Sequence, residues 1–176
     1  GGFRAGQVGA GDAANFAAQL LDFMHERLRN LLKDTGHDAR VIDAVLAQRP
    51  TRIDLVPATL DAVVAFSSLP EAQSLAAANK RIVNILRKAE EGVGSEVDAS
   101  LFAEAAERDL HAALAAIAPV LRNDLDGGRY AEALSALAGL RAPVDRFFDD
   151  VMVNADDALI RANRLALLAR VAAAMN

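Results

Sequence analysis

The chain has 176 residues, a formal net charge of −5 and no cysteine, which excludes disulfide bonds and thiolate metal sites. A chain of this length can bury enough apolar surface to fold as one domain or slightly more. Apolar residues make up 53% of the sequence, with many alanines and leucines, and this composition favours helices. The sequence shows neither a signal peptide pattern nor an uncharged apolar run of about 20 residues, so we expect a cytoplasmic protein without a membrane segment.

The N-terminal segment 1–11 is rich in glycine and reads GGFRAGQVGAG. We expect it to be a disordered linker or the remnant of a larger protein. In the following region, 12–69, apolar residues at helical spacing predict three helices that pack on the rest of the bundle. The expected ranges are 12–34, with Asp12 as N-cap and Gly36 after its end; 38–48, capped at His37-Asp38 and stopped by Pro50; and 54–67.

The second region, 70–176, continues the helical pattern to the C-terminus. Pro119 should kink or split one of its helices near Ile117, because proline removes a backbone donor inside a helix. The last helix is apolar on nearly every side, which predicts a central helix that is the least exposed of the set. The expected elements are helices over 70–90, 103–126, 130–140, 143–152 and 157–174, with a loop over 91–100.

No stretch alternates with a period of two residues, so we expect no sheet. The predicted fold class is an all-α helical bundle of about seven or eight helices.

Candidate metal and catalytic residues are few. Glu107 and His111 have the i, i+4 spacing that can bind a metal, but the sequence has no matching pair for a facing helix, so we expect a surface pair. The same interpretation applies to Asp22 and His25. The serines lie in no nucleophile motif, and no glycine-rich phosphate loop is present. We therefore expect no catalytic residue and no metal site.

The segment Asn79–Lys88 (NKRIVNILRK) is basic although the chain as a whole is acidic. Its four cations, with no acidic residue between them, are Lys80, Arg81, Arg87 and Lys88. Helical spacing puts most of them, together with Asn84, on one stripe opposite the apolar residues Ile82, Ile85 and Leu86. Such an edge can hold RNA phosphates while Asn84 hydrogen-bonds to a base or a ribose. A solvated helix face explains the same residues, and spacing and charge alone favour that simpler interpretation.

Arg161 and Arg164 lie one turn apart on the otherwise apolar last helix, and a buried helix seldom keeps arginine without a partner. They either pair with acidic residues and hold the preceding turn, or face an RNA loop, and the sequence supports the two interpretations equally. The candidate acidic partners are Asp149, Asp150 and Asp156. We expect Phe147 and Phe148 in the core rather than as a platform for stacked bases.

Two segments resemble a known family. Near the C-terminus, F-F-D-x-V-M-V (147–153) is followed by two acidic residues and by I-R-x-N-R-L-A-L-L (160–168), and K-R-x-x-N-I-L-R-K (80–88) precedes them. Together they resemble the DALR-type anticodon-binding domain, which is shared with arginyl-tRNA synthetase, in the form found at the end of the β subunits of bacterial glycyl-tRNA synthetases. Residues 157–161 match the Asp-Ala-Leu-Arg run of that domain with one extra residue.

The resemblance implies a region that binds the anticodon of glycine tRNA and supports the ATP-dependent charging of that tRNA by an aminoacyl-tRNA synthetase. In this family the α subunit makes glycyl-adenylate with ATP and Mg, and the whole enzyme is a tetramer of two α and two β subunits. The fragment itself would hold no cofactor and bind no DNA. Glycine anticodons have cytosine at their second and third positions, which can be read on their Watson–Crick edges. The implied tRNA-binding residues are Lys80, Arg81, Asn84, Arg87, Lys88, Arg161 and Arg164.

The alternative function is that of a non-catalytic helical bundle that docks a protein partner through an apolar groove. RNA binding weakens steeply with salt, whereas apolar docking does not, so salt dependence separates the two.

Overall fold

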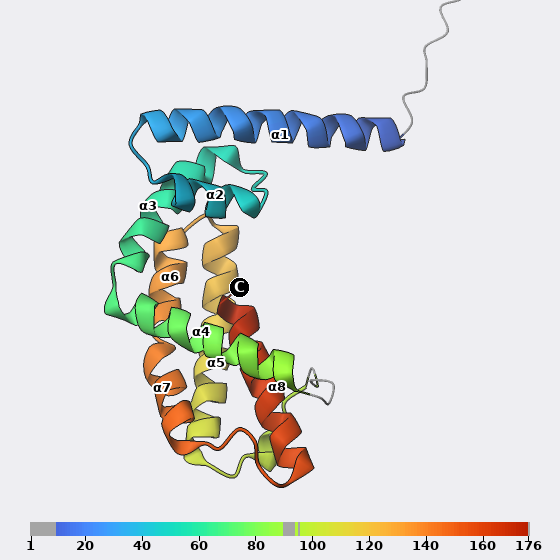
Figure 1. The fold of residues 1–176 in the computed structure, drawn as a ribbon, viewed down its shortest axis with the longest axis vertical. Helices are drawn as coiled ribbons and strands as arrows, with labels where there is room; N and C mark the ends of the chain where they lie inside the picture. Colours follow the sequence, from blue (N-terminus) through green and yellow to red (C-terminus); the bar gives the residue numbers. More distant parts are fainter. Residues whose placement is uncertain (1–9, 90–93, 95, 176) are drawn as a thin grey trace, which may run out of the picture. The chain divides into compact units, whose positions relative to one another are not determined.

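The computed structural model describes residues 10–89, 94 and 96–175 (Figure 1). This part of the chain contains eight α-helices, two short 3₁₀ helices (η) and no β-strand, which confirms the predicted all-α class. The elements are α1 (Ala10–Asp34), α2 (Ala39–Ala47), η1 (Ile53–Leu55), α3 (Val56–Ser67), α4 (Pro70–Lys88), η2 (Ala99–Leu101), α5 (Ala105–Asp126), α6 (Tyr130–Ala138), α7 (Arg141–Asp150) and α8 (Ala158–Met175). Most of the linker expected over 1–11 and part of the loop expected over 91–100 lie outside the described residues.

The chain forms two compact units, Gly1–Asp61 and Ala62–Asn176. The division lies within α3, and the boundary expected between residues 69 and 70 falls at the start of α4. Neither α4 nor any other described helix is by itself long and apolar enough to span a membrane, and only the bent pair Ile53–Ser67 and Pro70–Lys88 reaches that length and hydropathy together.

In the first unit, α1 packs against α2. Asp38 caps α2 by accepting a hydrogen bond from the backbone N–H of Arg40 at 2.8 Å, as predicted. The N-cap expected at Asp12 is wrong, because α1 already begins at Ala10. Gly36 follows the end of α1 with a φ of +93°, a conformation that glycine adopts without steric cost. The buried apolar residues of this unit are Leu32, Ile42, Val45, Leu46, Val56 and Leu60.

The surface pair expected between Asp22 and His25 is wrong. His25 is only 7% exposed, and its Nε2 lies 2.8 Å from the carbonyl oxygen of Pro50. Asp22 forms an ion pair with Arg49 instead, at 2.8 Å. The physical reason is the helical period, because His25 lies one turn from Leu21 and shares with Leu32 the face of α1 that is turned inward.

In the second unit, α8 packs against α4 and α5, and α5 also packs against α6 and α7. Eight residues of α8 are buried, more than in any other described helix, and this confirms the prediction drawn from its apolar sequence. Asp157 caps α8 by accepting hydrogen bonds from the backbone N–H groups of Leu159 and Ile160. The fully buried core residues include Ile82, Leu110, Leu140, Val144, Phe147, Leu167, Leu168 and Val171.

Helix α5 runs from Ala105 to Asp126 without interruption, so the split expected near Ile117 does not occur. Pro119 is exposed, and so is Ala115, whose carbonyl oxygen would otherwise accept from the missing N–H. Water can satisfy that carbonyl on the solvent side, which lowers the cost of proline at this position.

Candidate nucleic-acid interface

Helix α4 presents a basic edge to solvent. Lys80, Arg81, Arg87 and Lys88 are all exposed, whereas Ile82 is fully buried on the opposite side of the helix. Asn84 is half-buried, and its Oδ1 accepts a hydrogen bond from Nη2 of Arg87 at 3.1 Å. These four cations and Asn84 will be called the α4 edge.

Most of the α4 edge surrounds one shallow hollow of about 420 Å³. Arg87 does not line the hollow, but it donates a hydrogen bond to Asn84, which does. Positive groups around a concave surface can contact successive phosphates of one strand. The residues that line the hollow are Ala77, Lys80, Arg81, Asn84, Ile85 and Lys88.

Arg81 is fixed against α7. Its guanidinium carbon lies 4.0 Å from the centre of the Phe148 ring, a cation–π contact that spacing along the sequence did not reveal. Phe148 in turn meets Phe147 edge to face, with ring centres 5.8 Å apart. Phe147 belongs to the core, as predicted. Phe148 is half-buried, and its ring packs against the guanidinium group of Arg81.

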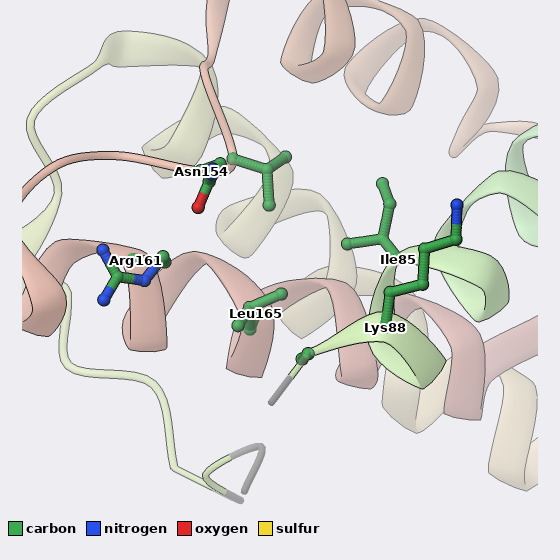
Figure 2. A pocket seen from close by; sticks show the side chains of 7 residues that line it. Ile85, Lys88, Asn154, Arg161 and Leu165 are labelled. Atoms are coloured by element: carbon green, nitrogen blue, oxygen red, sulfur yellow. The ribbon is translucent and has the colours of Figure 1, made fainter. Parts of the chain in front are cut away.

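A pocket of about 570 Å³ lies between the end of α4 and the start of α8 (Figure 2). Figure 2 shows Ile85 and Lys88 on one side, Arg161 and Leu165 rising from α8 on the other, and Asn154 on the loop that precedes α8. Its polar lining residues are Lys88, Asn154 and Arg161, and its apolar ones are Ile85, Ala89, Val153 and Leu165. The α4–α8 pocket therefore brings Lys88 and Arg161, two predicted site residues, to one place.

Arg161 holds the loop between α7 and α8. Its Nη1 donates to the carbonyl oxygen of Ala155 at 2.6 Å and to that of Asp156 at 3.4 Å. These two contacts to backbone carbonyl oxygens support the interpretation that Arg161 stabilises the preceding turn.

Arg164 lies inside the second unit and is only 6% exposed. Its Nη1 donates to the carbonyl oxygen of Met152 at 2.7 Å, while Nε and Nη2 donate to the carboxylate of Glu107 at 2.9 and 3.2 Å. A side chain enclosed in this way is not available to RNA, and we remove Arg164 from the candidate interface. Its carboxylate partner was not among the acidic residues that we expected.

Glu107 is fully buried, so the surface pair expected with His111 is wrong. It lies one turn from Leu110 on the inward face of α5, and its carboxylate also accepts from the backbone N–H groups of Ala103 and Glu104. Burial raises the pKa of this carboxyl, but the hydrogen bonds from Arg164 and the Glu104 backbone outweigh burial and hold the pKa below its ordinary value. The ring of His111 instead packs against Phe102, with centres 5.4 Å apart.

Asn163 connects α8 to the backbone of Asp98, the residue that precedes η2. Its Oδ1 accepts from the backbone N–H of Asp98 at 2.8 Å, and its Nδ2 donates to the carbonyl oxygen of Asp98 at 2.9 Å. Sequence analysis gave this residue no role. The signal was its position as one of the three polar residues that precede Arg170 in an otherwise apolar helix, each of which holds a different piece of backbone in place. Within the described ranges, no group of three or more His, Asp or Glu residues could hold a metal ion.

Comparison with known proteins identifies the domain. Residues 75–176, which include the α4 edge and all of α8, match the family model described as the DALR anticodon binding domain. The chain belongs to this family. The predicted resemblance is therefore confirmed, and the DALR domain covers the second unit from within α4 onward.

Three relatives of the DALR-domain chain are named glycine–tRNA ligase beta subunit. The protein of that name from Aromatoleum aromaticum is 59% identical over 164 residues, or 93% of this chain and 23% of the relative. Those from Dechloromonas aromatica and Thiobacillus denitrificans are 54% and 56% identical over 90% and 88% of this chain, and 22% of each relative is covered. The chain thus spans less than a quarter of the length of these relatives.

Proposed function

We propose that this DALR domain binds the anticodon loop of a tRNA along the α4 edge. The observation that carries the proposal is the exposed run of Lys80, Arg81, Arg87 and Lys88 inside the region that matches an anticodon-binding family. The chain has a net charge of −5, so this edge is a local reversal of sign. Acidic surfaces elsewhere repel phosphates and help to confine RNA to the basic edge.

We further propose that the tRNA is glycine tRNA and that the domain serves ATP-dependent charging by a cytoplasmic glycine–tRNA ligase. The name of the relatives from Aromatoleum aromaticum and Dechloromonas aromatica, glycine–tRNA ligase beta subunit, supports this proposal. The domain contributes tRNA binding and no catalytic group. Adenylate chemistry, with ATP and Mg, is assigned to an α subunit in a complex of two α and two β subunits.

A titration with two tRNAs tests the proposal. The chain is titrated with glycine tRNA and with the same tRNA changed at the second and third anticodon positions, at several salt concentrations. We expect tighter binding of the unchanged tRNA, with a salt slope of about 0.7 log unit for each phosphate contact. Equal affinity for both tRNAs at every salt concentration overturns the proposal.

A second candidate function is docking on an apolar protein surface, which the exposed face of α1 favours. Five large apolar residues lie on that face although α1 already packs against α2 by another one. Docking of this kind depends little on salt, which distinguishes it from RNA binding by the α4 edge. The exposed residues are Phe16, Leu20, Phe23, Met24 and Leu31.

A further inference from the structure

We propose that the α4–α8 pocket receives one unstacked base of the bound RNA loop and that the side-chain amide of Asn154 hydrogen-bonds to the edge of that base. The proposal rests on the proposed function and adds the place where the RNA is read. Binding of phosphates along α4 alone would give affinity without sequence preference, because phosphate contacts position a strand and base contacts specify it.

The lining of the α4–α8 pocket matches the chemistry of a nucleobase. Ile85, Val153 and Leu165 provide apolar walls for the faces of a flat ring, and polar groups are few. None of the described lining residues is acidic, so none of these side chains repels the phosphate of an entering nucleotide. The volume of about 570 Å³ falls within the usual range of small-molecule pockets.

The pocket continues the α4 edge. Ile85 and Lys88 line both the shallow hollow and the α4–α8 pocket, so the two concave surfaces are neighbours. A strand whose phosphates lie along Lys80 and Arg81 therefore reaches the pocket at Lys88 without crossing an acidic surface of α4. A base turned out of such a strand at that point enters the pocket.

Asn154 is suited to read the edge of a base. It is exposed on the pocket rim, and within the described part of the chain its side chain makes no hydrogen bond. Its amide offers one acceptor and a donor group side by side, the pattern that pairs with the Watson–Crick edge of a base. The amide thus has hydrogen-bonding capacity that the described residues leave unused.

The loop that carries Asn154 is held on both sides. Arg164 binds the carbonyl oxygen of Met152 and Arg161 binds that of Ala155, so the two residues between them, Val153 and Asn154, face the pocket from a fixed backbone. Preorganised groups lose less entropy on binding and discriminate better. The two arginines are positioning residues in this arrangement.

The test uses anticodon stem-loop hairpins with 2-aminopurine at single loop positions and the 176-residue chain. A base that leaves the stack and enters the pocket raises the 2-aminopurine fluorescence, and none of the described lining residues is aromatic and able to quench it. Two variants are compared with the wild type: Asn154→Ala, which removes the amide, and Ala89→Leu, which fills the pocket. Met152→Ala is the matched control, because Met152 is 74% exposed in the same loop and does not line the pocket.

We expect Asn154→Ala to weaken binding of the preferred hairpin by about tenfold, the size of one lost hydrogen bond to an unpaired group, with an unchanged salt slope. Ala89→Leu should abolish the fluorescence rise at one loop position, and Met152→Ala should behave as wild type. If Asn154→Ala keeps full preference and full fluorescence change while circular dichroism shows an intact fold, the pocket assignment is overturned and the proposed function stands. If the wild type itself shows no anticodon preference, the proposed function fails first. Should Ala89→Leu not fold, the exposed Asn154 position decides alone.

Discussion

Arg164 of α8 and Glu107 of α5 form a buried ion pair, with Nε 2.9 Å from one carboxylate oxygen and Nη2 3.2 Å from the other. The same carboxylate closes the capping box of α5 by accepting from the backbone N–H of Glu104. The other guanidinium nitrogen of Arg164, Nη1, donates a hydrogen bond to the carbonyl oxygen of Met152. One ion pair thus joins the start of α5, the middle of α8 and the loop that carries Asn154.

Removal of one partner of this pair should destabilise the second unit strongly. Glu107→Gln and Arg164→Met each leave a buried charge without its counterpart, which costs about 3–5 kcal/mol in comparable buried pairs. The double variant Glu107→Leu/Arg164→Met should cost less than the sum of the single ones, because it buries no unpaired charge. Urea unfolding followed by circular dichroism measures the three values. Additive costs would show that the two residues do not act as a pair.

Stability should fall at acid pH through the same carboxyl. The pKa of Glu107 is held below its ordinary value, so the folded state binds fewer protons than the unfolded state near that pH. Its contribution is therefore complete above the unfolded value of about 4.3 and is lost as pH falls through the lower, folded value. The free energy of unfolding, measured from pH 7 downward, should decrease less steeply for Glu107→Gln than for the wild type. Parallel curves would exclude Glu107 as a source of the pH dependence.

Helical periodicity predicted every α-helix of the described part, and the apolar sequence of α8 correctly predicted the most buried one. Those predictions succeeded because they depend on neighbours three or four residues apart. Glu107 was misplaced because local spacing pairs it with His111, whereas its partner lies 57 residues away on another helix. The contact between Arg81 and Phe148 escaped prediction for the same reason, since it depends on how α4 packs against α7.

Charge reversal on the α4 edge should weaken tRNA binding. Arg81→Glu and Lys88→Glu together remove two of its four cations, and the salt slope should decrease by about one to two phosphate contacts, each worth about 0.7 log unit. The control is the double reversal Arg122→Glu/Arg170→Glu, which changes the net charge equally at exposed positions on α5 and α8. Equal losses in both double variants would mean that only net charge matters. Unchanged affinity in the α4 variant, with helicity intact, would remove the α4 edge from the interface.

Asn84→Ala should affect preference rather than electrostatics. Asn84 lies in the hollow between cations and carries no charge, so its removal should reduce the preference for the glycine anticodon while the salt slope stays constant. Its hydrogen bond with Arg87 is exposed, so folding should survive the change. Filter binding with the two tRNAs described above measures both quantities. A lower salt slope with intact preference would instead indicate that Asn84 acts by placing Arg87 on a phosphate.

Two substitutions of Arg161 separate its two possible roles. Arg161→Lys keeps the positive charge but cannot reproduce the planar guanidinium that reaches the carbonyl oxygen of Ala155, and Arg161→Gln removes the charge as well. If Arg161 acts by holding the loop that carries Asn154, both variants should lose anticodon preference, and Arg161→Lys should keep the salt slope of the wild type. If Arg161 binds a phosphate directly, Arg161→Lys should retain the anticodon preference of the wild type. Arg161→Gln should then lower the salt slope by about 0.7 log unit. The geometry favours the first result, because its Nη1 already donates to the loop backbone at 2.6 Å. Arg170 is exposed and lies on the opposite side of α8 from Arg161. Arg170→Gln therefore serves as the charge control for the anticodon preference and for the salt slope.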